Sequence, residues 1–144
     1  MRPRPIADPE PTRAETPPPT DLLVYDDDCG FCTAAARWLQ DHSRWPLHLV
    51  PISALPLPGI LGSPETGSLP GSAHFVTSEG WEYHGGAAIT RALRLVRGGV
   101  AFACLDLPLL RTLRAAAYQL VARHRHRISR LLGTKCAFPD RRKV

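Results

Sequence analysis

Short apolar runs predict two strands and a helix in the first half of the chain. Leu22–Tyr25 is apolar without interruption, which is typical of a strand buried on both faces. We expect this strand over about residues 22–26 and, after three aspartates and two cysteines, a helix over about residues 31–42. Leu47–Val50 is a second apolar run, bounded on each side by a proline. The pattern therefore begins as strand, helix, strand.

The second half of the pattern predicts a hairpin followed by a helix. His74–Thr77 and Trp81–His84 are rich in strand-forming residues and are separated by Ser78–Gly80, which is a hairpin signal. Residues 53–72 contain four prolines and four glycines, which allow at most one short helical turn. A helix is expected over about residues 87–97, ended by two glycines. This β-α-β-(α)-β-β-α order is that of the thioredoxin fold, an α/β architecture.

A long amphipathic helix is predicted beyond that core, over about residues 107–132, with Asp106 and Pro108 at its start. Three of its arginines, at positions 123, 127 and 130, fall opposite an apolar stripe. His124 lies within the stripe and is expected to be a core residue rather than a catalyst. The stripe consists of Leu110, Leu113, Ala117, Leu120, Val121, Ile128, Leu131 and Leu132.

The length of the chain fits a single domain, which we place at residues 21–140, with the long helix as its C-terminal extension. Residues 1–20 hold seven of the 15 prolines and are expected to form a disordered proline-rich tail. They contain no apolar segment of the kind found in secretory signal peptides. No stretch approaches the length of about 20 apolar residues that a membrane span requires. The sequence therefore predicts a cytoplasmic protein.

Positive charge is concentrated in the last third of the chain. Residues 1–90 carry 5 Lys/Arg and 11 Asp/Glu, whereas residues 91–144 carry 13 and 2. A basic segment can meet nucleic acid, an anionic membrane surface or an acidic partner. Because the charges are not interleaved with aromatic residues for base stacking, a solvated helix face is the favoured interpretation and nucleic acid is not an expected partner.

The candidate chemistry lies where the first strand gives way to the first helix. Asp26–Asp28 is followed there by Cys29-Gly30-Phe31-Cys32. Free backbone N–H groups and the partial positive charge of a helix N-terminus stabilise a thiolate at such a place. The two-residue spacer puts the second sulfur one turn deeper, close enough to close a disulfide. In a reducing cytosol a C-x-x-C pair is more often catalytic than structural, so the motif indicates thiol–disulfide exchange.

Three other interpretations of these residues are weaker. Two cysteines can be half of a zinc site, but Cys104 and Cys136 stand alone, so no metal site is expected. A purely structural disulfide across two residues would close almost no loop entropy. Asp26-x-Asp28 after an apolar strand also resembles the nucleophile motif of haloacid-dehalogenase-like phosphotransferases. Those enzymes need a downstream acidic pair for Mg²⁺, and only two isolated acidic residues follow residue 90.

Four segments together resemble the DCC family of thiol–disulfide oxidoreductases, named for its Asp-Cys-x-x-Cys motif. They are Tyr25–Cys32, Gly86–Ile89, Tyr118–Arg125 and Cys136–Pro139, and the resemblance spans about residues 21–140. It implies a thioredoxin-like fold, Cys29 and Cys32 as the redox pair, and Asp26 and Asp28 as the accompanying acids. The family usually has Gly at the place of Asp27, and Asn-Arg-Tyr at the place of His124-Arg125-His126.

The expected reaction is a two-step dithiol exchange. Cys29, at the exposed end of the helix, is expected to attack a disulfide, and the less accessible Cys32 to resolve the mixed disulfide. Asp26 or Asp28 is the candidate acceptor for the proton of Cys32. The acidic run opposes thiolate formation unless the fold brings a base close, and His124 or Arg125 of the last helix is the obvious candidate.

One element of thioredoxin-like enzymes is missing from its usual place. A cis-proline normally precedes the third strand and faces the dithiol, whereas Pro70 lies too early and Ser72 or Ala73 takes that position. We therefore expect substrate backbone to dock differently from its docking on thioredoxin.

Two functional hypotheses follow. The first is a cytoplasmic oxidoreductase that reduces protein or small-molecule disulfides, re-reduced by a thiol donor and needing no cofactor. The second is a thioredoxin-like adaptor or redox-sensing module that docks a partner through its basic C-terminal helix.

Overall fold

The structure is a computed structural model and describes residues 10–14, 16–54 and 73–133. The strands are β1 (Thr12–Arg13), β2 (Asp21–Tyr25), β3 (Leu47–Pro51), β4 (His74–Val76) and β5 (Trp81–His84). The helices are α1 (Gly30–His42), α2 (Gly85–Leu95) and α3 (Pro108–Leu131), with the 3₁₀ segments η1 (Ile52–Ala54) and η2 (Gly99–Asp106). The expected α/β class and the order of its core elements are confirmed.

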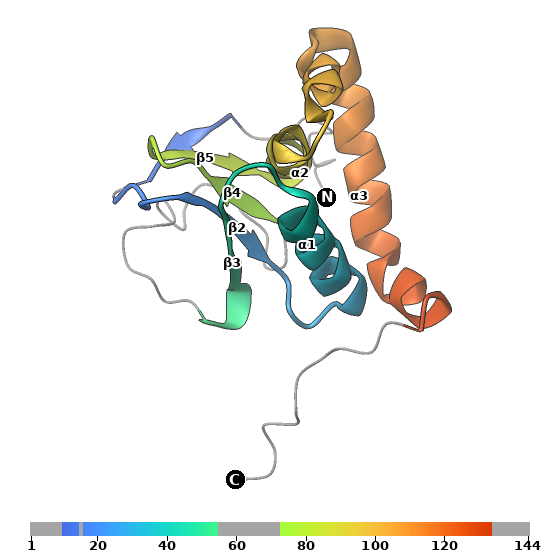
Figure 1. The fold of residues 1–144 in the computed structure, drawn as a ribbon. Helices are drawn as coiled ribbons and strands as arrows, with labels where there is room; N and C mark the ends of the chain where they lie inside the picture. The colour runs from blue at the N-terminus through green and yellow to red at the C-terminus, as the bar shows by residue number, and fades with distance from the viewer. Residues whose placement is uncertain (1–9, 15, 55–72, 134–144) are drawn as a thin grey trace, which may run out of the picture.

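The five strands form one mixed sheet in the order β1-β5-β4-β2-β3. β2 pairs in parallel with β3, which is reached through α1, and antiparallel with β4. The β4–β5 hairpin turns at Gly80, whose φ of 88° is a conformation that suits glycine. Figure 1 shows α1 and α2 beside the sheet, with α3 running along both of them on the side away from it.

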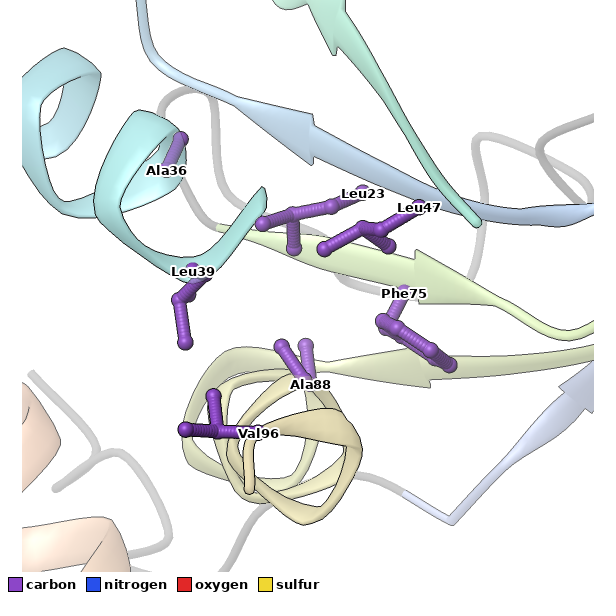
Figure 2. Packing of buried hydrophobic residues seen from close by; sticks show 8 residues of the cluster. Leu23, Ala36, Leu39, Leu47, Phe75, Ala88 and Val96 are labelled. Carbon is purple, nitrogen blue, oxygen red and sulfur yellow. The ribbon is translucent and has the colours of Figure 1, made fainter. Parts of the chain in front are cut away.

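The core is divided between the two faces of the sheet, because neighbouring residues of a strand point to opposite sides. Leu23 and Phe75 face the helices and pack with residues of α1 and α2 in the cluster of Figure 2. Leu22, Val24 and Val76 belong to a second cluster on the other face. The uninterrupted apolar run of β2 thus reflects burial on both sides, as the sequence predicted.

The second face also carries a buried polar group formed by His74, Glu82 and His84 of the β4–β5 hairpin. Burial lowers the pKa of His84; the Glu82 carboxylate opposes this shift and His74 adds to it. The His84 ring is therefore neutral at pH 7.

The expectation for the N-terminal segment needs correction. Thr12 and Arg13, inside the segment expected to be a disordered tail, pair with Glu82 and Trp81 as an edge strand. The sequence pattern missed this strand because it is only two residues long and is held by its partner strand. Residues 1–9, 15, 55–72 and 134–144, including Cys136, lie outside the described residues.

The apolar stripe expected to be the buried face of α3 is largely exposed. Leu113, Leu120 and Leu131 are 65%, 61% and 86% exposed, and His124 is exposed as well. The residues of α3 that are buried are Ala115 and Ser129. The contacts that α3 makes with α1, α2 and the β2–α1 turn set its orientation, and these contacts include polar groups that a hydrophobic period cannot reveal. Within the described ranges, no helix is long and apolar enough to cross a membrane.

Candidate functional site

The two cysteines occupy the first turn of α1 as the sequence predicted. Cys29 is the N-cap residue, with an extended backbone (φ −106°, ψ 111°), and its Sγ accepts a hydrogen bond from the Cys32 N–H at 3.3 Å. A sulfur in this position receives one of the N–H groups that the first helical turn leaves without a backbone partner. Both cysteines are free thiols in this structure. The geometry favours negative charge on the Cys29 sulfur.

The accessibility of the two thiols is the reverse of what was expected. Cys29 is 0% exposed, whereas Cys32 is half-buried. One contact of the buried Cys29 sulfur is with Ser129 in the last turn of α3. Its Oγ accepts a hydrogen bond from the Phe31 N–H at 3.0 Å and lies 3.7 Å from the Cys29 sulfur. Because that Oγ receives the N–H with a lone pair, its own proton can point at the Cys29 sulfur.

The three aspartates before the dithiol have separate surroundings. Asp26 is buried, and its carboxylate binds Arg125 of α3 at 2.8 Å and the Asp28 N–H at 3.0 Å. Asp27 is also buried and accepts hydrogen bonds from the backbone N–H and the hydroxyl of Ser53 in η1. Asp28 is exposed. The fold thus brings Asp26 and its partner Arg125 close to the thiols, whereas Asp27 is hydrogen-bonded to η1.

The charge balance acts most strongly on Cys32. The pKa of its thiol is raised to about 12, chiefly by burial and also by the hydrogen bond and charge of Cys29 and by Asp26, while Arg125 acts to lower it. Cys32 therefore keeps its proton at neutral pH while both thiols are reduced. The sequence offered His124 and Arg125 as candidate basic residues near the thiols, and Arg125 is the one that lies there. His124 instead contacts the Leu120 carbonyl of its own helix.

A cavity of about 360 Å³ lies between the sheet and the three helices, and Cys32 forms part of its wall. Asp26 and Arg125 flank Cys32 in this wall, and Arg114 and Tyr118 of α3 also line it. The rest of the lining is mainly apolar, with residues such as Leu23, Ala36, Leu39, Ile89, Leu93 and Val121. Cys29 is not part of the wall. The cavity can hold an apolar group next to the Cys32 sulfur.

The position usually held by a cis-proline is occupied by Ala73, immediately before β4. Its backbone N–H donates to Tyr118 Oη at 3.0 Å, and its carbonyl accepts from the Gly85 N–H at 2.9 Å. The described residues contain no cis peptide bond. Both polar groups of this backbone position are therefore engaged within the chain, and the Tyr118 hydroxyl takes the donor that an incoming strand would otherwise meet.

Sequence reasoning missed Ser129, Tyr118 and Ser53 as partners of the site. Ser129 stands four residues after Arg125 and eleven after Tyr118, so that the three share one side of α3. The available signal was a tyrosine and a serine at that spacing within an arginine-rich helix; Tyr118 opens one of the segments that resemble the DCC family, whereas Ser129 lies beyond it.

Comparison with known proteins identifies a family whose profile covers most of the chain. The profile of the DCC1-like thiol-disulfide oxidoreductase family matches residues 23–131, which include the dithiol, the acidic turn and all of α3. No curated protein and no solved structure matches the chain.

Proposed function

The chain belongs to the DCC1-like thiol-disulfide oxidoreductase family, and we propose that it reduces disulfides by exchange through Cys29 and Cys32. The observation that carries this proposal is the position of the Cys29 sulfur at the N-terminus of α1, where it accepts the Cys32 N–H at 3.3 Å. We further propose that the protein works in the cytoplasm on protein or small-molecule disulfides, and that an external thiol donor supplies two electrons for each turnover.

Cys29 is the attacking residue in this scheme, although it is the less accessible thiol. With a pKa of about 12, on the order of one Cys32 side chain in 10⁵ is ionised at pH 7. Cys29 needs only to be uncovered. Ser129, which covers it, lies in the last turn of α3, and helix ends open locally at low free-energy cost. Limited access to Cys29, whose sulfur accepts a helix N–H, is therefore a smaller obstacle than full access to a thiol that rarely ionises.

The first step joins the Cys29 sulfur to one sulfur of the substrate disulfide. The substrate S–S bond breaks, and its second sulfur leaves as a thiolate that takes a proton from water. An apolar group of the substrate next to that disulfide can occupy the cavity beside Cys32, whose wall is mainly apolar.

The second step is made easier by the first. Two of the influences that raise the pKa of Cys32 come from Cys29, through its hydrogen bond and its charge, and both are removed when Cys29 enters a mixed disulfide. Cys32 then loses its proton, for which the Asp26 carboxylate in the same cavity wall is the acceptor in this scheme, and attacks the Cys29 sulfur. The Cys29–Cys32 disulfide forms and the reduced substrate leaves. Asp28 contributes its backbone N–H, which holds the Asp26 carboxylate.

Insulin and glutathione disulfide reduction, with a thiol donor in excess, tests this function. Cys29→Ser and Cys32→Ser should each reduce the rate to that of the donor alone. Cys104→Ser is the matched control, since Cys104 is an exposed free thiol on η2, and it should keep the wild-type rate. A double Cys29→Ser/Cys32→Ser variant that retained activity would overturn the proposal.

A second candidate function, an adaptor that docks a partner, is supported by the exposed leucines of α3, of which Leu109 is 88% and Leu131 86% exposed. Exposed apolar side chains on one helix are common at protein–protein contacts. Under this alternative, the double-serine variant keeps its partner, and Leu113→Glu together with Leu120→Glu releases it without changing disulfide reduction.

A further inference from the structure

Two histidines and a glutamate meet on the face of the sheet opposite the dithiol. His74, Glu82 and His84 are 3%, 1% and 5% exposed. The β4–β5 register places His74 directly opposite His84, while Phe75, the next residue of β4, points to the helix-side core. One ligand atom from each of the three residues lies within 4.8 Å of the others. None of these side chains contributes to the cavity or to the thiol chemistry.

The spacing of these atoms fits a tetrahedral ion. His74 Nδ1 lies 3.1 Å from Glu82 Oε1 and 3.0 Å from His84 Nδ1, and the third side of the triangle, from His84 Nδ1 to Glu82 Oε1, is 3.7 Å. A tetrahedral Zn²⁺ with bonds of about 2.0–2.1 Å to nitrogen and oxygen requires neighbouring ligand atoms about 3.3 Å apart. The three protein distances bracket that value, so an ion just above the triangle reaches all three atoms.

Thr12 on β1 contacts the atoms of His84 and Glu82 that face away from the triangle. Its Oγ lies 3.2 Å from His84 Nε2 and 3.5 Å from Glu82 Oε2, toward which it donates. When Nε2 carries the ring proton and donates to this hydroxyl, the His84 Nδ1 lone pair points into the triangle. Glu82 likewise accepts the Thr12 hydroxyl at Oε2 and directs Oε1 toward the triangle. Ligand rings in metal sites are oriented in this way by the hydrogen bond at their other nitrogen.

We propose that His74, Glu82 and His84 form a binding site for one Zn²⁺-like divalent ion, with a water molecule as the fourth ligand. Two imidazoles and a carboxylate are a donor set that zinc accepts. Both rings would bind the ion through an unprotonated Nδ1. Because all three ligands are buried, the ion is structural: it fastens the β4–β5 hairpin and, through Thr12, the edge strand β1.

Zinc binding by a full-length chain with all four cysteines changed to serine tests this site, because the dithiol cannot then contribute ligands. We expect one Zn²⁺ per chain and a higher Tm when zinc is added. Glu82→Gln should weaken zinc binding by more than about 100-fold, and Thr12→Val by about 10- to 100-fold. His124→Gln with His126→Gln, two exposed histidines of α3, is the control and should leave binding unchanged.

Cobalt substitution in the wild-type chain gives an independent readout. Co²⁺ at this site should show the visible bands of a tetrahedral ion without the near-ultraviolet charge-transfer band that sulfur ligands produce. Two results would overturn the proposal. One is a folded four-serine chain that binds no zinc, which would mean that hydrogen bonds alone hold the cluster together. The other is stoichiometric zinc binding that survives both Glu82→Gln and Thr12→Val.

Discussion

Arg125 on α3 and Asp26 in the turn after β2 form an ion pair, with 2.8 Å between Nη1 and Oδ2. The guanidinium and the carboxylate are 18% and 8% exposed, and both belong to the wall that surrounds Cys32. The pair fastens the last third of the chain to the redox turn, and it offsets one of the negative charges that oppose ionisation of the thiols.

Arg125→Met should therefore lower the free energy of unfolding by about 3 kcal/mol, because the buried carboxylate of Asp26 loses its partner. Arg123→Met, which alters an exposed arginine of the same helix, should change stability by less than about 0.5 kcal/mol. Urea unfolding of both variants measures the difference. Adding Asp26→Asn to Arg125→Met should recover part of the loss; a double variant as unstable as the sum of the two single changes would show that the residues are not coupled.

The raised pKa of Cys32 predicts an alkaline loss of stability in the reduced protein. Above pH 9 the unfolded chain ionises this thiol, whereas the folded chain keeps the proton until the pH nears 12. The free energy of unfolding is therefore expected to fall as the pH rises from about 9 toward 12, by at most about 1.4 kcal/mol per pH unit. The difference in unfolding free energy between wild type and Cys32→Ser, measured from pH 8 to pH 11 with dithiothreitol present, isolates this thiol. A difference that does not change with pH contradicts the prediction.

Ser129→Ala should expose Cys29 and weaken the start of α1. The Phe31 N–H loses its acceptor and the Cys29 sulfur loses a neighbouring hydroxyl, for an expected cost of about 1 kcal/mol. Alkylation of Cys29 should become faster relative to Cys104 in the same sample, as read by peptide mass mapping. Thr112→Ala, on the exposed side of α3, serves as the control, and an unchanged ratio of the two cysteines would show that Ser129 does not limit access.

The order of the two thiols in the reaction predicts which variant accumulates mixed disulfides. Cys32→Ser removes the resolving thiol, so covalent adducts should remain on Cys29, whereas Cys29→Ser should form few. Non-reducing gels after incubation with an oxidised substrate separate these cases. The reverse pattern, with adducts trapped on Cys32, would assign the attack to the more exposed thiol.

The strands, the helices and the place of the dithiol could be predicted because each rests on local signals. The apolar run of β2, the hairpin before Gly80 and the cysteines at a strand–helix junction lie within a few residues of one another in sequence. The side of α3 that meets the domain could not be predicted this way. Its orientation follows from contacts such as Ser129 with Phe31 and Arg125 with Asp26, which join distant segments and leave its leucines exposed.

The same limit applies to charge and accessibility at the site. Counting three aspartates before Cys29 predicted a thiolate opposed by its surroundings, but Asp26 is paired with Arg125 and Asp27 is tied to Ser53. The cluster of His74, Glu82 and His84 was likewise invisible, because the residues are separated along the chain and meet only through the register of the β4–β5 hairpin. The strand register and the helix packing must be known before such groups of residues can be identified.

The central claim is that Cys29 and Cys32 form a reversible redox pair, and mapping of the disulfide tests it most directly. The full chain is equilibrated across a series of glutathione redox buffers, its free thiols are alkylated, and its peptides are identified by mass. We expect one intramolecular disulfide between Cys29 and Cys32, which forms in the oxidising buffers and is broken in the reducing ones. Cys104 should remain alkylated throughout. A dominant Cys104–Cys136 bridge with Cys29 and Cys32 still reduced would contradict it.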